Sequence, residues 1–516
     1  MQTDTKNIDA VLLEKFENEI WGRVPHIDKT SGRAVNPTPL TDITQDLIEC
    51  ARKEFGLNLG DKDLKVFGKF DSNLLAGSIK VRPAVHIIHD AISTGKLKSG
   101  QSVFEATSGN FGIALGQLSR LGLDVVVLVS RKLQEGVFEE LKNEKIRIIN
   151  LDMDICPAPG MKENPNVLAA RATAANIRSQ LSELGFDPRP FDTASSEVHS
   201  LLAAQDIIGL AKVLAKTYSG FCPEQYDNGL NVDVHRTVTG PEIDQQLHEN
   251  GGSLADYEIA CTFGTGGTSG GLSRYIQEKY GKKSLHVIFP QADQDVAGIR
   301  TKAKTAGLRF YEPDRYAGQH EVDFEQARRL LKFFVDKGHD MGESSALALY
   351  AVMQMANLGH GGRFVVIVAD GISKYKKNLE SVGKKQNRIQ VSLQEAASNI
   401  GEYDKIIWIH TQYTPREEGI ELIAKTLGVD KSKIAVPTAR DVEWLLMRRQ
   451  VPEGLEKALQ GSRKSLLVCM AGNTSLMAVK ALSEHQISTE SLTGGISAIS
   501  QGKGKQISEL IRVSTE

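Results

Sequence analysis

The segment SVFEATSGNFGIALGQLSRLG (102–122) joins an apolar run to a helical pattern. Its first residues are typical of a buried β-strand, and the residues after Asn110 have apolar side chains at helical spacing. Between the two lie Thr107, Ser108 and Gly109, which offer hydroxyl groups and room for a ligand. Ligands of open α/β sheets bind at the carboxyl ends of strands. The segment therefore predicts a parallel α/β fold with a binding loop here, and a turn with a capping Ser or Asn is the alternative.

The alternation of buried strands and helices extends on both sides of this segment, over residues 62–375. Runs such as DVVVLVS (124–130), YEIACTF (257–263) and RFVVIVAD (363–370) are typical of strands buried on both faces. Strands that alternate with helices predict a parallel sheet with helices on both of its faces. The stretch 165–220 is mostly helical in pattern.

A polar stretch without periodicity, GKKQNRIQ (383–390), indicates the boundary of a second unit. Beyond it the alternation restarts with the apolar runs KIIWIH (405–410) and SLLVCM (465–470). A helix is expected after the second run. This C-terminal unit of ~125 residues is long enough to fold alone.

Composition and charge exclude several classes of partner. The 516 residues include 62 Lys and Arg and 64 Asp and Glu, so no excess charge favours nucleic acid or an acidic membrane. The apolar runs are far shorter than the ~20 residues of a membrane helix. The N-terminus lacks the pattern of a signal peptide, so we expect a cytoplasmic protein. The five cysteines are too widely spaced for a metal site, and we expect no disulfide framework.

A glycine-rich loop, CTFGTGGTSGG (261–271), follows a predicted strand and begins a helix. Glycines let the backbone approach a ligand closely, and backbone N–H groups at a helix N-terminus attract an anion. A phosphate group is the expected ligand, and a tight turn without a ligand is the alternative. The loop has neither the GK[ST] end of a Walker motif nor the GxGxxG spacing, which disfavours a nicotinamide-binding enzyme.

Lys80 lies in GSIK (77–80), near the start of an apolar helical pattern. A lysine in a first helical turn is disfavoured by the helix dipole, and the apolar neighbours Ile79 and Val81 argue against a wholly exposed position. A partly desolvated lysine has a lowered pKa and becomes nucleophilic, which suits it to forming a Schiff base. An ordinary solvated lysine is the alternative.

Six motifs, in this order along the chain, resemble those of the cysteine synthase and cystathionine β-synthase family. They are NPTPLTDI (36–43), GSIKVR (77–82), EATSGNFGI (105–113), TVTGPEI (237–243), FGTGGTSGG (263–271) and GESSALA (342–348). ADGISKY (369–375) is similar to the motif of that family's closing strand. The resemblance covers roughly residues 30–380. It implies a fold type II enzyme with two three-layer αβα subdomains, a pyridoxal 5'-phosphate cofactor and a homodimer.

The resemblance also implies roles for individual residues. Lys80 would bind the cofactor covalently, Asn110 would hydrogen-bond its phenolic oxygen, and Ser344 would meet its pyridine nitrogen. The residues that would hold its phosphate are Gly264, Thr265, Gly266, Gly267 and Thr268. Those that would bind the carboxylate of an amino-acid substrate are Thr107, Ser108, Gly109 and Gln225.

The implied activity is β-replacement on a serine-derived amino acid with a sulfur nucleophile, and Lys80 would act as the general base. Phe111, Val81 and the longer helical stretch at 156–220 depart from the family pattern on the substrate side. The leaving group and nucleophile therefore stay open. The alternatives are a β-elimination lyase (a cysteine desulfhydrase or dehydratase), a synthase with a non-sulfur nucleophile, and a regulatory protein that binds the cofactor without turnover.

The C-terminal unit resembles rhodanese-like sulfurtransferases. Cys469 follows a predicted strand and precedes a helix, where N–H groups lower the pKa of a thiol. VSLQEAASNIGEYDKIIWI (391–409) and ESLTGGISAIS (490–500) are similar to other parts of that family, although His410 and Thr411 replace its usual acidic and arginine pair. We expect Cys469 to supply or accept sulfur as a persulfide, and an inactive module with a buried thiol is the alternative.

The expected domains are accordingly an N-terminal extension (1–30), a catalytic domain with two subdomains (31–385) and a rhodanese-like domain (386–516).

Overall fold

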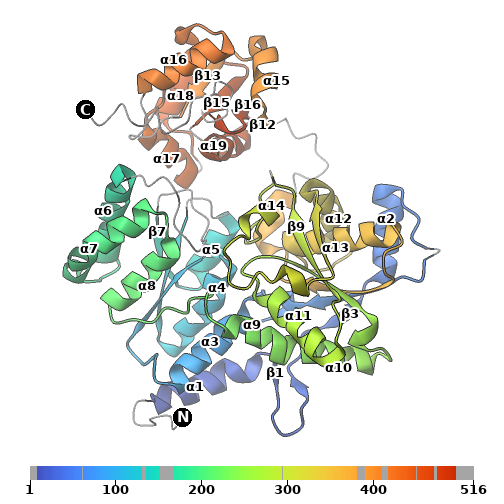
Figure 1. The fold of residues 1–516 in the computed structure, drawn as a ribbon. Coiled ribbons are helices and arrows are strands. Elements are labelled where there is room, and N and C mark those ends of the chain that lie inside the picture. The colour runs from blue at the N-terminus through green and yellow to red at the C-terminus, as the bar shows by residue number, and fades with distance from the viewer. Residues whose placement is uncertain are drawn as a thin grey trace. The chain divides into compact units, whose positions relative to one another are not determined.

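A computed structural model of the protein describes residues 8–60, 62–107, 109–130, 135–151, 167–292, 294–379, 390–409, 416–448, 450–469 and 473–495. The chain divides into two compact units, Met1–Val382 and Gly383–Glu516. Each unit has its own β-sheet structure, drawn as arrows in Figure 1. Each unit also has its own apolar cores.

The larger sheet of the first unit has six strands among the described residues. In spatial order they are β10 (Gly318–Val322), β9 (Leu285–Pro290), β8 (Glu258–Thr262), β11 (Arg363–Val368), β4 (Lys65–Phe70) and β3 (Leu40–Asp42). Strand β3 runs antiparallel to β4, and the other pairs are parallel. The apolar runs predicted as strands at 257–263 and 363–370 supply β8 and β11 in the middle of this sheet.

Helices cover both faces of the larger sheet, because alternate residues of each buried strand point in opposite directions. Val366 and Val368 of β11 pack in one core, and Val365 and Ile367 pack in the other. The helices of the first core are α2 (Thr44–Phe55), α12 (Phe324–Asp336) and α13 (Glu343–Asn357). Those of the second are α10 (Gly240–Glu249) and α11 (Gly267–Tyr280).

The smaller sheet of the first unit consists of the parallel strands β5 (Ser102–Ala106), β6 (Asp124–Val129) and β7 (Arg147–Asn150). On one face lie α1 (Ala10–Glu19), α3 (Val81–Ser93), α4 (Asn110–Gly116) and α5 (Glu135–Asn143). On the other face lie α6 (Val167–Glu183), α7 (Pro188–Ala203) and α8 (Ile207–Thr217), drawn in green in Figure 1. These three helices correspond to the stretch predicted as helical.

Shorter elements complete the first unit. They are β1 (His26–Ile27), which pairs with β2 (Ala34–Val35), the short helix α9 (Leu230–Val234), a π-helical turn (His235–Thr239) and α14 (Lys376–Leu379). The segment after α8 returns along the edge of β5, where Phe221 pairs with Val103.

The second unit contains a parallel sheet with helices on both faces. Its strands, in spatial order, are β12 (Gln390–Val391), β16 (Thr489–Leu492), β15 (Ser465–Val468), β13 (Lys405–Trp408) and β14 (Ile434–Ala435). On one face lie α15 (Leu393–Ser398) and α16 (Arg416–Leu427). On the other lie α17 (Ala439–Arg448), α18 (Glu453–Leu459) and α19 (Asn473–Glu484).

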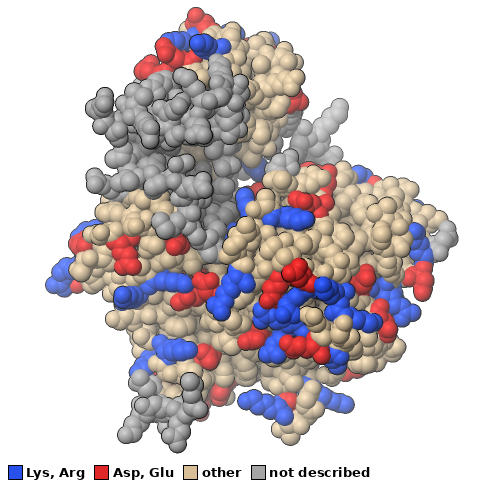
Figure 2. Space-filling model, in the orientation of Figure 1, with Lys and Arg blue, Asp and Glu red and all other residues tan. Residues whose placement is uncertain are grey.

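The surface carries both signs of charge. Figure 2 shows Lys and Arg side chains interspersed with Asp and Glu side chains on the face that is drawn. Within the described ranges, no helix combines the length and apolar character needed to cross a bilayer.

Candidate active site

Lys80 directly precedes α3, and the backbone around it is fixed to the end of β11. The N–H of Ile79 donates to the carbonyl of Ala369 (2.7 Å), and Ser78 pairs with Asp370 in an antiparallel bridge. The N–H of Lys80 itself donates to Oγ of Ser78 (3.1 Å). Because Ala369 and Asp370 follow β11, these bonds place Lys80 at the carboxyl edge of the larger sheet. They also explain why α3 begins directly after Lys80.

The Lys80 amine is desolvated and faces a glycine. Burial lowers its pKa to about 8. No carboxylate among the described residues forms an ion pair with its Nζ. A Cβ added at Gly264 would lie 4.0 Å from this Nζ and 2.8 Å from the carbonyl oxygen of Gly298. The Lys80 amine is therefore desolvated and lies beside the glycine-rich loop, an environment that suits a nucleophile.

The glycine-rich loop forms the N-terminus of α11. Gly266 precedes the helix with a φ of 88°, a conformation that favours glycine. A Cβ at Gly267 would collide with the side chain of Asn231. Asn231 Nδ2 donates to Oγ1 of Thr265 (3.0 Å), which also accepts from the N–H of Gly267 (3.3 Å). The loop is thus packed tightly against Asn231, and the N–H groups at the start of α11 make a site for an anion.

His235 lies behind the loop and contacts Thr268. Its Nε2 is 3.3 Å from Oγ1 of Thr268, and its Nδ1 is 3.0 Å from Oγ1 of Thr239. Burial, together with the charges of Arg82 and Lys80, holds the pKa of His235 well below its ordinary value. A neutral imidazole therefore orients the Thr268 hydroxyl.

The loop after β5 is organised by Thr107. Its Oγ1 accepts hydrogen bonds from the N–H groups of Gly109 (3.0 Å) and Gly112 (3.3 Å), so it caps the start of α4. Gly109 has a φ of 135°, which excludes most other residues. The turn is thus capped by a threonine hydroxyl. Ser108, predicted to bind the substrate carboxylate, lies outside the described residues.

Asn110 is held by a carboxylate from the end of β11. Its Nδ2 donates to Oδ2 of Asp370 (2.8 Å), which also accepts from the hydroxyl of Tyr375 (2.6 Å). Burial and the neighbouring Asp370 raise the pKa of Tyr375 well above its ordinary value, so its hydroxyl stays protonated. Oδ1 of Asn110 is buried without a hydrogen-bond partner among the described residues.

Ser344 lies in the first turn of α13 and is nearly buried. The N–H of Gly342, just before that helix, donates to the carbonyl of Asp370 (2.8 Å). Asp370 therefore connects three predicted cofactor-binding segments: the backbone before Lys80, the Asn110 side chain and the start of the Ser344 helix.

Gln225 reaches the same region from the segment along β5. It is buried, and its Nε2 donates to the carbonyl of Ala106 (3.3 Å), directly before Thr107. Its own carbonyl accepts from Nδ2 of Asn231 (2.6 Å), the amide that also binds Thr265. The predicted carboxylate-binding loop and the predicted phosphate loop are therefore joined by Asn231.

A fully buried network of ion pairs contains Arg82, two residues after Lys80. Arg82 donates to Asp71 (2.8 Å) and Glu242 (2.7 Å), and Lys69 pairs with Glu242 (2.5 Å). Thr38 contributes its N–H to Glu242 (2.8 Å) and its hydroxyl to Asp71 (2.7 Å). Burial would raise the pKa of Glu242, but Arg82 and Lys69 outweigh it and lower that pKa. Three quoted motifs, NPTPLTDI, GSIKVR and TVTGPEI, thus meet in one network.

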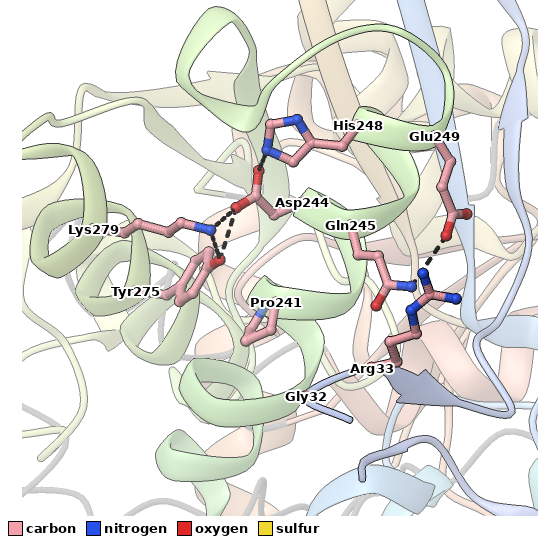
Figure 3. A pocket seen from close by; sticks show the side chains of 9 residues that line it. All are labelled: Gly32, Arg33, Pro241, Asp244, Gln245, His248, Glu249, Tyr275 and Lys279. Carbon is pink, nitrogen blue, oxygen red and sulfur yellow. Dashed lines mark hydrogen bonds and ion pairs between the residues drawn. The ribbon is translucent and has the colours of Figure 1, made fainter. Parts of the chain in front are cut away.

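A separate hollow of about 510 Å³ lies beside α10 (Figure 3). None of the predicted site residues lines it. Its buried carboxylate, Asp244, accepts hydrogen bonds from Tyr275 (2.8 Å) and Tyr280 (2.6 Å) and pairs with Lys279. Because these partners already satisfy Asp244, we assign no ligand to this hollow.

In the second unit, Cys469 directly follows β15 and is buried. Its Sγ accepts hydrogen bonds from the backbone N–H and from the hydroxyl of Ser475, each at 3.3 Å. Ser475 belongs to the first turn of α19, so the sulfur lies at a helix N-terminus. His410, Thr411 and the end of ESLTGGISAIS (496–500) lie outside the described residues.

The residues present fit pyridoxal phosphate. Lys80 supplies a desolvated amine, and the glycine-rich loop offers N–H groups to a phosphate. Asn110 is half-buried, and its Oδ1 is buried without a hydrogen-bond partner in the part of the chain that the structure describes. Residues 34–370 match the sequence model described as "Pyridoxal-phosphate dependent enzyme". The chain belongs to this family. The predicted cofactor and the predicted class of enzyme are thereby confirmed.

Two curated relatives are cysteine synthases. A cysteine synthase from Staphylococcus aureus is 27% identical over 350 residues, covering 65% of this chain and 96% of the relative. Cysteine synthase B from Escherichia coli is 26% identical over 318 residues, covering 61% of this chain and 88% of the relative.

Among solved structures, a hydrogen sulfide-producing enzyme with an α-aminoacrylate intermediate aligns with a TM-score of 0.51 at 19% identity, covering 72% of this chain and 92% of that chain. It supports the predicted α/β fold. The rhodanese-like nature of the second unit stays a prediction.

Three residues with defined contacts were not singled out from the sequence: Asn231, His235 and Asp370. Asn231 and His235 lie between Gln225 and the motif TVTGPEI, and Asp370 lies in ADGISKY. Their nearness to these motifs was the available signal.

Proposed function

We propose that this protein catalyses β-replacement on a serine-derived amino acid with a sulfur nucleophile. The observation that carries the proposal is the Lys80 amine, with a pKa of about 8, facing the glycine-rich loop. Ser344 supports it further, because a neutral hydroxyl at the pyridine nitrogen favours chemistry at the β-carbon over wider carbanion chemistry. The similarity to cysteine synthases points to sulfur as the nucleophile.

Pyridoxal phosphate, when bound, supplies an electron sink for bond cleavage next to the substrate's α-carbon. In this proposal the N–H groups at the start of α11 bind the phosphate, and Asn110 binds the phenolic oxygen. Lys80 first holds the cofactor and then, as a free amine, takes the α-proton. With a pKa of about 8, about a tenth of this amine is neutral at pH 7, which suits a general base.

The substrate carboxylate is assigned to the loop after β5 and to Gln225. The bond from Gln225 to Ala106 places its amide next to that loop. Gly109 leaves its backbone open to the ligand, and Ser108 and Thr107 add hydroxyl groups. A serine-derived substrate bound here loses its β-leaving group, and the nucleophile then adds at the β-carbon.

Product analysis tests this function. The purified holoenzyme is incubated with O-acetylserine, O-phosphoserine, serine or cysteine, with and without sulfide. Replacement predicts that one of the serine derivatives plus sulfide gives cysteine, with release of the leaving group. A keto acid formed equally with and without sulfide would instead establish β-elimination, and Lys80→Ala must abolish either activity.

A second role concerns the C-terminal unit: we propose that Cys469 carries sulfur as a persulfide. The N–H of Ser475 bound to its Sγ supports this role, because N–H donors at a helix N-terminus stabilise a thiolate. Attack of the thiolate on thiosulfate would give the persulfide and sulfite. Sulfite release from thiosulfate is therefore the assay, with Cys469→Ser as the variant and Cys261→Ser as a control, since Cys261 is a buried thiol of the first unit. Equal sulfite release from both variants would remove this role.

A further inference from the structure

We propose that Glu105 is a positioning residue that holds the Gln225 loop against β5 and thereby sets the affinity for the substrate's carboxylate. The proposal deepens the function above and rests on it, since it concerns the same carboxylate site. Glu105 precedes the predicted ligand-binding residues of the EATSGN segment (105–110). The roles predicted for that segment belong to its hydroxyl, glycine and amide residues, and Glu105 has none.

The carboxyl group of Glu105 is enclosed. The residue is 1% exposed, and its Oε1 accepts from the N–H of Ala106 (3.1 Å). Its Oε2 is buried without a hydrogen-bond partner among the described residues. The backbone N–H groups of Glu224 and Gln225 lie near enough to lower the pKa of this carboxyl group. A strand residue thus faces the backbone of the segment that carries Gln225.

The shape of that segment explains the contact. Phe221 extends the edge of β5, since the N–H of Phe104 donates to its carbonyl (2.8 Å). Glu224 then adopts a φ of 58°, a left-handed conformation that costs about 1 kcal/mol in a residue other than glycine. Consecutive N–H groups around a left-handed residue form a concavity that binds an oxygen atom. The Glu105 carboxyl group faces the N–H groups of Glu224 and Gln225, which act to lower its pKa.

The contact reaches both ligand-binding loops. Gln225, next to Glu224, donates to Ala106 at the end of β5 and accepts from Asn231. Asn231 in turn donates to Thr265 of the glycine-rich loop. Release of the segment from Glu105 would move the Gln225 amide first.

The environment of Glu105 makes its effect on the affinity for the substrate's carboxylate dependent on pH. Burial raises the pKa of Glu105 to about 8, and the N–H groups of Gln225 and Glu224 offset this effect only in part. The Glu224 carboxylate turns away to Lys212 (2.7 Å), which also pairs with Asp227 (3.1 Å), and the thiol of Cys222 has a raised pKa. Most Glu105 side chains are therefore neutral at pH 7. Above pH 8 the buried anion repels the substrate's carboxylate.

The test compares holoenzymes of wild type, Glu105→Gln and Glu105→Ala. Asp124→Asn is the control, because it removes a half-exposed carboxylate at the amino end of the same sheet. Two quantities are measured: the hydrogen exchange of the amides of 221–226, and the KM and kcat of the amino-acid substrate between pH 6.5 and 9.

Glu105→Ala is expected to raise KM about tenfold with kcat changed less than about threefold, and to speed exchange at 224 and 225. Glu105→Gln mimics the neutral acid, so it is expected to keep the wild-type KM at pH 7 and to lack the rise of KM above pH 8. Should Glu105→Ala fail to fold, the pH profile of Glu105→Gln decides alone.

Unchanged exchange and KM in Glu105→Ala, or a Glu105→Gln profile that still rises like the wild type, would overturn the proposal. A wild type that turns over no amino acid would contradict the proposed function instead, and exchange at 224 and 225 would still decide whether Glu105 holds the segment.

Discussion

Replacement of Glu242 by glutamine is expected to destabilise the first unit strongly. Glu242 accepts from Arg82, Lys69 and Thr38, and the side chains of Glu242, Arg82 and Lys69 are fully buried. The network contains two cations and two carboxylates, so it is neutral. Glu242→Gln leaves one buried positive charge uncompensated and turns amide hydrogens toward two cationic donors.

The cost of removing one partner from a buried ion pair is about 3–5 kcal/mol. No screening by solvent reduces it, because both partners have an exposed fraction of 0%. The unit that ends at Val382 has an unfolding entropy of ~0.8 kcal/mol/K at the usual ~2.1 cal/mol/K per residue, so ~4 kcal/mol lowers Tm by about 5 °C. Calorimetry of the apoprotein measures this decrease.

Two further variants make the reasoning refutable. Asp336→Asn removes an exposed carboxylate paired with Lys332 and is expected to change Tm by less than about 1 °C. Glu242→Gln combined with Lys69→Met restores neutrality and is expected to recover part of the loss. A Tm of Glu242→Gln within 1 °C of wild type, or a double variant less stable than the sum of the two single effects, would refute the reasoning.

Three other predictions concern the cofactor site. Gly267→Ala drives a methyl group into Asn231 and is expected to weaken cofactor binding at least about tenfold in reconstitution titrations. Gly270→Ala is the control and is expected to bind the cofactor like the wild type, because the nearest atom to its new methyl group would be 3.6 Å away. Asp370→Asn removes the charged acceptor of Asn110 and Tyr375, so about 10- to 100-fold weaker cofactor binding and a shifted absorbance maximum are expected. Burial lowers the pKa of Lys80 to about 8 from 10.5, so the unfolded chain holds more protons between these values and the apoprotein gains stability as pH rises from about 8 to 10.5. Denaturation of apo Lys80→Met should therefore show greater stability than wild type at pH 7, with the difference vanishing above pH 10.5.

Local sequence patterns sufficed to predict the strands and several candidate binding residues. The buried runs at β5, β6, β8 and β11 have the length and apolar content of central parallel strands, and glycine marks the places where the backbone must turn or approach a ligand. The position of Lys80 followed from its apolar neighbours. These features depend on residues close together in the chain.

Contacts between distant residues were beyond such patterns. Lys69 and Glu242 are 173 positions apart, and Asn110 and Asp370 are 260 apart, so no local spacing indicates that they meet. The oxygen of Thr107 also accepts from Gly109 and Gly112, because a helix start needs its N–H groups satisfied. The predicted contact of Thr107 with the substrate stays a prediction.

The covalent attachment of the cofactor to Lys80 is the central claim, and borohydride reduction tests it most directly. The holoenzyme is reduced, digested and analysed by mass spectrometry for the lysine that carries the pyridoxyl group. The desolvated amine facing Gly264 predicts that the label is found on Lys80 and that Lys80→Ala is unlabelled. A label on another lysine of the wild type, or none in protein that binds the cofactor, would contradict the account.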